Sequence, residues 1–192
     1  SSPSVSEAEV KAEIRGAISM PQGDMMNQER YMLKSVLDLS EVDVDDIMVH
    51  RSQMVSLNAA LPTEEIINFV SRSPYSRIPL WLGKRENIIG ILHSKALLKM
   101  MNAYYTNGKN ISIKNYLTKP WFVLNTTSLL DQLHAFKKRH EHFAVVVDEY
   151  GALQGIVTLE DVLEEIVGDI ADETDIPDKS ELLVKKTESG AY

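Results

Sequence analysis

Thr158 and Asp161 stand where a predicted strand turns into a predicted helix, directly after the apolar run that ends at Val157. A helix N-terminus carries free N–H groups and the positive end of the helix dipole, and both favour phosphate. A threonine hydroxyl can donate to a phosphate oxygen, and an aspartate can accept from the two hydroxyls of a ribose. Thr-x-x-Asp is also close to a capping box, so the pair could instead serve only to start the helix.

Carboxylates are dense around the same position and in the residues that follow. They are Glu160, Asp161, Glu164, Glu165, Asp169, Asp172, Glu173 and Asp175. Carboxylate oxygens suit a hard cation, but magnesium usually binds together with the phosphates of a ligand and not in an all-protein cage. We therefore expect a solvated acidic helix face, no metal held by the protein alone, and any magnesium to arrive on bound phosphates.

Other chemical signals are weak. His134, His140 and His142 are close in sequence, but a strand that starts here would point the last two apart, which does not favour a zinc site. The chain has no cysteine, which excludes disulfides and a thiolate nucleophile. It also lacks the phosphate-loop, nucleophile-elbow and His-Glu-x-x-His motifs. We predict that the chain is not an enzyme.

Composition indicates a globular chain of 192 residues with an acidic surface. The formal net charge of −8 argues against nucleic acid as a partner, because an acidic chain repels a polyanion. No apolar run approaches the roughly 20 residues that span a bilayer, and the polar start does not resemble a signal peptide. We expect the chain to be soluble, and it could be a soluble piece of a larger membrane protein.

An internal repeat supplies the elements that must position Thr158 and Asp161. Gly155 follows Gly90 by 65 residues, and Ala144 follows Ile78 by 66, so the copies differ by one residue in a turn. The first copy is predicted to have a short segment at 47–50, a helix at 63–72, strands at 77–81 and 88–92, and a helix at 95–101. The second copy has the corresponding segment at 116–120, a helix at 128–140, strands at 143–147 and 152–157, and a helix from 159 to about 170.

The apolar patterns support these assignments. Residues 145–147 are three consecutive valines, as in a strand buried on both faces. Leu159, Val162, Leu163, Ile166, Val167 and Ile170 form one helical stripe. Each copy should therefore be a β-α-β-β-α unit with one small sheet and helices on one face. The predicted fold class is α/β, with two such units related by pseudo-twofold symmetry and packed together, after an N-terminal helical lead-in.

The lead-in is predicted to hold two helices with few large apolar residues. Ser6 and Glu9 form a capping-box pattern before a helix that continues to Ile18. A second helical run starts at about Asn27.

At this point the residues resemble a known family. The segment GIVTLED at 155–161 looks like the closing motif of a cystathionine-β-synthase (CBS) domain, and two tandem copies resemble a CBS pair, or Bateman module. Three further segments resemble the CorC/HlyC and cyclin-M (CNNM) group: DIMVHR at 46–51, YSRIP at 75–79 and VVDEYG at 146–151. The resemblance covers about residues 27–176. It implies a lead-in at 1–45, CBS domains at 46–108 and 109–172, and an acidic linker with the start of a truncated C-terminal domain at 173–192.

The resemblance also implies a site for an adenosine nucleotide. The implied site residues are Tyr75, Arg77, Ile156, Thr158 and Asp161. In the family pattern the tyrosine stacks on adenine, the arginine pairs with phosphate, and Thr158 and Asp161 bind phosphate and ribose. Without the family, Tyr75 could equally be a half-buried core residue and Arg77 a surface residue.

The first copy departs from this pattern. His93 holds the position of Thr158, and Ala96, which has no acceptor for a ribose, holds that of Asp161. We predict one competent site per chain, with Ser94 as a partial substitute if the first copy also binds.

Together these features predict a regulatory, homodimeric module that binds ATP (or AMP or ADP), with Mg²⁺ on the phosphates. It would lie on the cytoplasmic side of the membrane and act on the membrane domain of a magnesium and cobalt efflux protein. Two alternatives stay open: a ligand-free dimerisation scaffold of the same parent protein, and part of an enzyme that acts on nucleotides.

Overall fold

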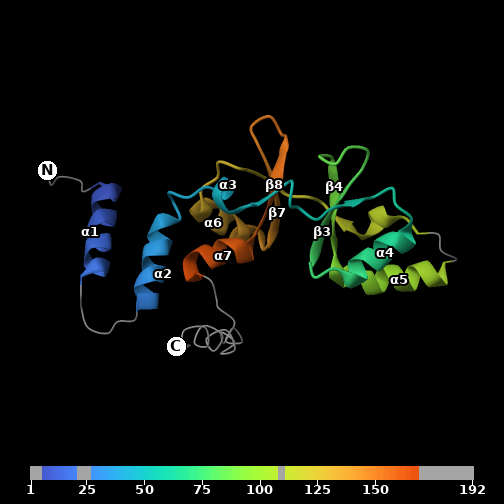
Figure 1. Ribbon diagram of the computed structural model, residues 1–192, viewed down its shortest axis with the longest axis horizontal. Helices are drawn as coiled ribbons and strands as arrows, with labels where there is room; N and C mark the ends of the chain where they lie inside the picture. The colour runs from blue at the N-terminus through green and yellow to red at the C-terminus, as the bar shows by residue number, and fades with distance from the viewer. Residues whose placement is uncertain (1–5, 21–26, 108–110, 169–192) are drawn as a thin grey trace, which may run out of the picture.

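The computed structural model describes residues 6–20, 27–107 and 111–168 (Figure 1). Three helices come first: α1 (Glu7–Ser19), α2 (Asn27–Asp38) and α3 (Val44–Ile47). The first copy contains β1 (Val49–His50), β2 (Leu57–Asn58), α4 (Thr63–Arg72), β3 (Arg77–Trp81), β4 (Ile88–His93), the 3₁₀-helix η1 (Ser94–Ala96) and α5 (Leu97–Thr106). The second copy contains the 3₁₀-helix η2 (Ile113–Tyr116), β5 (Leu117–Thr118), β6 (Phe122–Leu124), α6 (Leu129–Arg139), β7 (Phe143–Val147), β8 (Leu153–Thr158) and α7 (Leu159–Val167).

The predicted helices and central strands are all present, but the helix predicted at 95–101 begins as η1 and continues in α5 to Thr106. The Ser6 capping box at the start of α1 is formed as its spacing predicts. Strands β2 and β6 were not predicted, because two and three residues are too few to show an alternating pattern. Helix α7 ends at Val167 with Gly168 as its cap, and the predicted continuation to Ile170 lies outside the described residues.

The two copies exchange their first strands. One sheet has the order β1-β8-β7-β6 and the other β2-β3-β4-β5, so β1 joins the sheet of the second copy and β5 joins that of the first. Both exchanged strands run antiparallel to their new neighbour. The expectation that each copy forms its sheet alone is therefore wrong. The pseudo-twofold relation and the α/β class are confirmed, since the two exchanges mirror one another.

Glycine permits both exchanges. A Cβ on Gly155 would collide with the carbonyl oxygen of Val49 in β1. A Cβ on Gly90 would lie 2.7 Å from the Cβ of Leu117 in β5. Glycine recurs at both positions because a strand from the other copy pairs closely with β8 and with β4.

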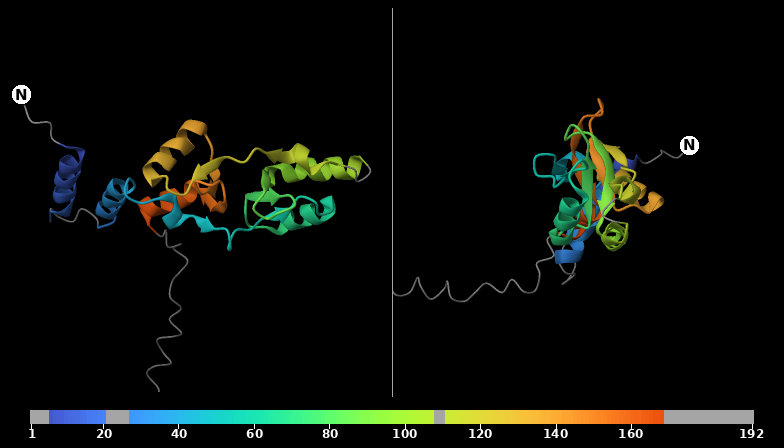
Figure 2. Two further views of the ribbon diagram at one scale, coloured as in Figure 1. Left: turned by 90° about the horizontal axis from the view of Figure 1, so that it is seen from above. Right: turned by 90° about the vertical axis from the view of Figure 1, so that its right-hand side faces the viewer.

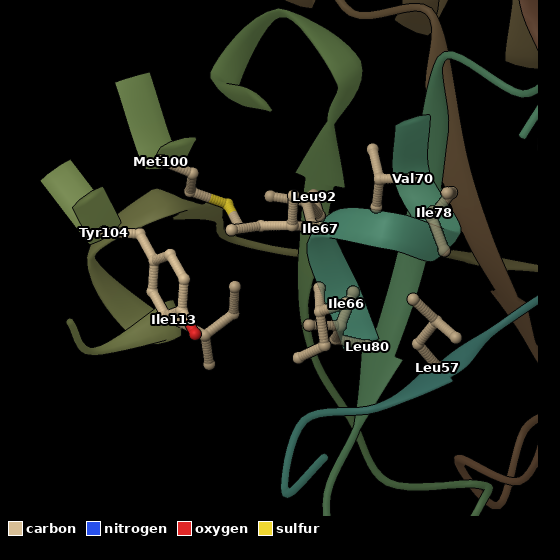
Figure 3. Packing of buried hydrophobic residues seen from close by; sticks show 10 residues of the cluster. All are labelled: Leu57, Ile66, Ile67, Val70, Ile78, Leu80, Leu92, Met100, Tyr104 and Ile113. Atoms are coloured by element: carbon tan, nitrogen blue, oxygen red, sulfur yellow. The ribbon is translucent and has the colours of Figure 1, made fainter. Parts of the chain in front are cut away.

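Each copy has its own core between its sheet and its helices. In the first copy, side chains of α4 and α5 pack on those of β3 and β4 (Figure 3). In the second copy, Phe136 and Leu129 of α6 and Val162 of α7 pack on β7 and β8. Burial of each large apolar side chain contributes about 1.5–3 kcal/mol, so these clusters hold the helices in place.

A third core joins the copies. It consists of Met54, Ile88, Ile91, Phe143, Val145 and Leu153, with Trp81 and Ile156 packed against it. Val145 belongs to this cluster, whereas its neighbours Ala144 and Val146 belong to the second copy's own core. The valine run is therefore buried on both faces, as predicted.

The lead-in helices lie at one end of the molecule, away from α4 and α5 (Figure 2). Helix α2 packs against α7, and Leu39 and Val44 extend the lead-in into the second core. Helix α1 contacts α2 and is held by polar links, including Arg15 to Asp38 at 2.7 Å and to Glu41 at 2.9 Å. No helix among the described residues is long and apolar enough to cross a bilayer.

Candidate nucleotide-binding site

A cavity of about 390 Å³ opens between the two copies, and all five residues of the predicted site line it. Tyr75 and Arg77 come from the start of β3 in the first copy. Ile156, Thr158 and Asp161 come from β8 and the first turn of α7 in the second copy. The strands that carry them are fixed by the core between the copies, so the structure brings together residues that are about 80 positions apart in sequence.

Thr158 and Asp161 form a complete capping box at the start of α7. The backbone N–H of Asp161 donates to Thr158 Oγ1 at 3.2 Å, and that of Thr158 donates to Asp161 Oδ2 at 2.8 Å. The Thr158 hydroxyl acts only as an acceptor here, so its own proton can still be donated. Asp161 Oδ1 accepts no hydrogen bond from the described residues. The capping role is real, and it leaves donor and acceptor capacity that faces the cavity.

Tyr75 and Arg77 are not core residues. The Tyr75 side chain is 54% exposed, and its backbone N–H donates to Ser73 Oγ at 3.2 Å. The reading of this tyrosine as a half-buried core residue is therefore wrong. Arg77 is half-buried and forms no ion pair within the described part of the chain. Its guanidinium is therefore available to an anion in the cavity.

Apolar side chains form one wall of the cavity, and most of them were not predicted. Val49, Val55 and Phe143 line it together with Ile156. Val49 lies opposite Ile156 in the ladder between β1 and β8, and Phe143 lies opposite Thr158 in that between β7 and β8. Val49 lies within the DIMVHR segment but was not predicted as a site residue, because its place in the cavity depends on the strand exchange.

The acidic residues divide between the cavity and solvent. Glu160 lines the cavity, and its Oε1 lies 3.9 Å from Nδ1 of His142. Glu164 and Glu165 are exposed on α7, in agreement with a solvated face, whereas Asp169, Asp172, Glu173 and Asp175 lie outside the described residues. Among the residues that the structure describes, no group of three or more His, Asp or Glu side chains is placed to hold a metal ion.

The first copy has no equivalent set of polar groups. His93 caps η1, with its Nδ1 accepting from the backbone N–H of Lys95 at 3.1 Å. Burial lowers the pKa of His93 below its usual 6.5, and the positive charges of Arg77 and Lys95 lower it further. Ala96 offers no carboxylate, and Phe143 begins β7 where Arg77 begins β3. Half-buried Ser94 remains the polar side chain next to His93.

Comparison with known proteins connects this geometry to a family. The family model for the CBS domain matches residues 44–103 and 113–168, which are the two copies. The magnesium and cobalt efflux protein CorC of Pasteurella multocida is 36% identical over 156 residues, which cover 80% of this chain and 51% of that protein. The chain spans about half the length of the curated relatives it matches.

Solved structures agree with this match. The CBS domain of a bacterial CNNM/CorC family Mg²⁺ transporter is 34% identical with a TM-score of 0.75, and the match covers 88% of this chain and all of that one. A structure of such a CBS domain in complex with ATP is 35% identical with a TM-score of 0.67, covering 74% of this chain and 99% of that one. With the tandem repeat, the exchanged strands and the GIVTLED motif, these matches show that the chain belongs to the CBS-domain family and is a CBS-domain pair of the CNNM/CorC group.

Proposed function

We propose that this CBS pair is a regulatory module that binds ATP in the cavity between its two copies. The observation that carries the proposal is the single cavity that unites Tyr75 and Arg77 of one copy with Thr158 and Asp161 of the other. The related CBS domain that was solved with ATP supports the choice of ligand. In this proposal the module binds the nucleotide and makes no covalent change to it.

The lining of the cavity fits the parts of a nucleotide. Its volume of about 390 Å³ falls within the usual range of small-molecule sites, roughly 300–1,000 Å³. The apolar wall and the exposed ring of Tyr75 suit a base. Asp161 Oδ1 suits the ribose hydroxyls, and the Thr158 hydroxyl and the Arg77 guanidinium suit the phosphates.

Charge favours ATP as its magnesium complex. Among the described residues that line the cavity, Arg77 is the cation, and Glu160 and Asp161 are anions. One guanidinium does not balance a triphosphate beside two carboxylates. A magnesium ion on the phosphates would offset this repulsion, and the phosphates would supply most of its ligands.

The fold offers a route from the cavity to the lead-in. The first turn of α7 lines the cavity, and the body of α7 packs against α2. If ATP binds the two copies in one arrangement more tightly than in others, it shifts α7, and α2 moves with it. We infer that the lead-in carries this change to the membrane domain of a magnesium and cobalt efflux protein. In this scheme the pair is a homodimer on the cytoplasmic side of the membrane.

Isothermal titration calorimetry tests the proposal. The protein is titrated with ATP in EDTA, with ATP and Mg²⁺, and with AMP. We expect saturable binding of about one ATP per chain that is tighter with Mg²⁺. Asp161→Asn should weaken binding at least about tenfold, because a charged acceptor for the ribose is lost. Asp131→Asn is the matched control, since Asp131 is also the third residue of its helix but lies outside the cavity.

The outcomes separate the open alternatives. Absence of heat with every nucleotide, from folded protein free of carried-over ligand, would overturn the proposal and favour the dimerisation scaffold. Turnover of ATP that is lost in both Asp161→Asn and Arg77→Met would favour an enzyme. Equal weakening by Asp131→Asn and Asp161→Asn would show that the cavity is not the site.

A further inference from the structure

Gln53 is a polar residue of the cavity that the proposed contacts leave unused. Its side chain is exposed and lines the cavity, and it forms no hydrogen bond with the described residues. Other polar groups of the cavity have assigned roles or partners: Arg77, Thr158 and Asp161 are assigned to ribose and phosphate, and Glu160 lies 3.9 Å from His142. A free amide at the edge of a ligand cavity is suited to reading a polar edge of the ligand.

The loop that carries Gln53 is fixed at both ends. The backbone N–H groups of Gln53 and Met54 donate to the carbonyl of His50 at 2.8 and 3.1 Å. The backbone N–H of Arg51 donates to the carbonyl of Gln154 at 2.7 Å. His50 Nδ1 also lies 2.9 Å from Ser52 Oγ. Met54 is only 4% exposed and belongs to the core between the copies. The amide of Gln53 is therefore presented from a pre-ordered turn, which lowers the entropic cost of a contact with a ligand.

The antiparallel register of β1 and β8 carries the chain from Val49 away from Thr158 and into the turn that holds Gln53. Val49 pairs with Ile156 and His50 with Gly155, so the two strands run in opposite directions. On β8, the residues from Thr158 through Ile156 to Gln154 therefore lie beside β1 in the order that leads from Val49 to Arg51. The Gln53 turn follows directly after Arg51. The lining therefore runs from the polar groups of Thr158 and Asp161, past the apolar side chains of Val49 and Ile156, toward the turn of Gln53.

This order matches that of phosphate, ribose and base in a nucleotide. With the ribose at Asp161, the base lies against the apolar side chains and its polar edge reaches the Gln53 turn. Adenine presents there a 6-amino donor beside a ring-nitrogen acceptor. A glutamine amide offers the complementary acceptor and donor, and a bidentate pair of this kind discriminates by about 1–3 kcal/mol, which is roughly 5- to 150-fold in affinity.

We propose that Gln53 is a specificity-determining residue of this site. Its amide oxygen accepts from the 6-amino group of adenine, and its amide nitrogen donates to the neighbouring ring nitrogen. This inference rests on the proposed function and deepens it, because it assigns the choice of base to a residue that lies outside the GIVTLED motif.

A chemical double-mutant cycle tests the assignment. The affinities of ATP and of purine riboside 5′-triphosphate, which lacks only the 6-amino group, are measured in the presence of Mg²⁺ for the wild type and for Gln53→Met. Met keeps the length of the side chain and removes both polar atoms. For the wild type we expect ATP to bind at least about fivefold more tightly than the analogue. In Gln53→Met that ratio should fall to about one, with the loss on the ATP side.

Gln28→Met is the matched control, since Gln28 is exposed on α2 and lies outside the cavity; its ratio should equal that of the wild type. A ratio that persists in Gln53→Met would overturn the assignment while the proposed function stands. Equal affinities of the wild type for ATP and for the analogue would also overturn the assignment while the proposed function stands. If neither nucleotide binds the wild type, the proposed function fails and this inference fails with it.

Discussion

Thr158 and Asp161 show how one pair of side chains can serve the fold and the candidate site together. The box between them satisfies two backbone N–H groups at the start of α7, which otherwise lack partners within the helix. Because the box holds both side chains still, the remaining donor and acceptor atoms face the cavity in a fixed geometry. Capping and ligand binding can coexist at the level of sequence, and the structure shows the capping box with Thr158 and Asp161 on the wall of the cavity.

Removal of the Thr158 hydroxyl should therefore affect stability even without a ligand. Thr158→Val keeps the shape of the side chain but cannot accept from the N–H of Asp161, so we expect the free energy of unfolding to fall by about 0.5–2 kcal/mol. Thr158→Ser restores the acceptor and should recover most of that loss. Urea denaturation of the three proteins measures the difference. Equal midpoints for Val and wild type would contradict a capping role.

His93 gives a pH dependence with a defined sign. Its pKa in the folded protein is lowered, first by burial and then by Arg77 and Lys95, whereas in the unfolded chain it returns toward 6.5. The unfolded state therefore binds more protons below that value. The contribution of neutral His93 to stability is fully present above pH 6.5 and is lost as the pH falls through the lowered pKa.

The test compares urea midpoints at about pH 7.5 and pH 5.5 for wild type and His93→Gln. The drop on acidification should be smaller in His93→Gln, which cannot be protonated in this range. His134→Gln, at an exposed position on α6, should behave as the wild type. An identical drop in all three proteins would show that His93 makes no such contribution.

At the scale of elements, the strand exchange is the feature on which the site depends. Strand β1 brings Val49 to the cavity wall and leads into the Gln53 turn, although both belong to the first copy and Ile156 belongs to the second. Gly155 lets β1 approach, because any larger residue would place a Cβ on the backbone of Val49. In this fold a glycine within a strand thus marks the position where a strand from the other copy pairs with it.

Gly155→Ala should accordingly be costly. We expect a loss of about 1–3 kcal/mol in the free energy of unfolding, as in other overpacked sites, with a displaced β1. Gly16→Ala is the control, since a Cβ there meets nothing within 4 Å, and Ala favours a helix such as α1. Circular dichroism during urea denaturation reports both. A Gly155→Ala protein as stable as the wild type would mean that β1 does not pair with β8 as closely as described.

At the scale of the whole molecule, the sequence repeat predicts most of the architecture. The strand exchange is the part that it does not predict. Offsets such as Gly90 to Gly155 reveal two equal units, and stripes such as that of α7 reveal their helices. They contain no information on which copy a two-residue strand joins, because that choice depends on packing between the copies. For the same reason the sequence predicts site residues in YSRIP and GIVTLED, whereas the places of Val49, Gln53 and Phe143 in the cavity were not predicted.

The same packing predicts which helices respond to nucleotide binding. Helix α7 starts in the cavity and packs on α2, whereas no residue of α4 or α5 is among those that line the cavity, and both helices lie at the other end of the molecule from α1 and α2 (Figure 1). If ATP with Mg²⁺ orders the first turn of α7, amide exchange should slow there and also in α2, which opens only when it separates from α7. Exchange in the middle of α5 should stay unchanged and serves as the internal control.

Hydrogen exchange with mass spectrometry, with and without the nucleotide, measures these three regions at once. Asp161→Asn at the same nucleotide concentration should abolish the change in both α7 and α2, because both depend on occupation of the cavity. Slower exchange in α7 with no change in α2 would mean that binding stops at the second copy. In that case the lead-in could not carry a signal to a membrane domain through α7, and the regulatory part of the proposed function would need another route.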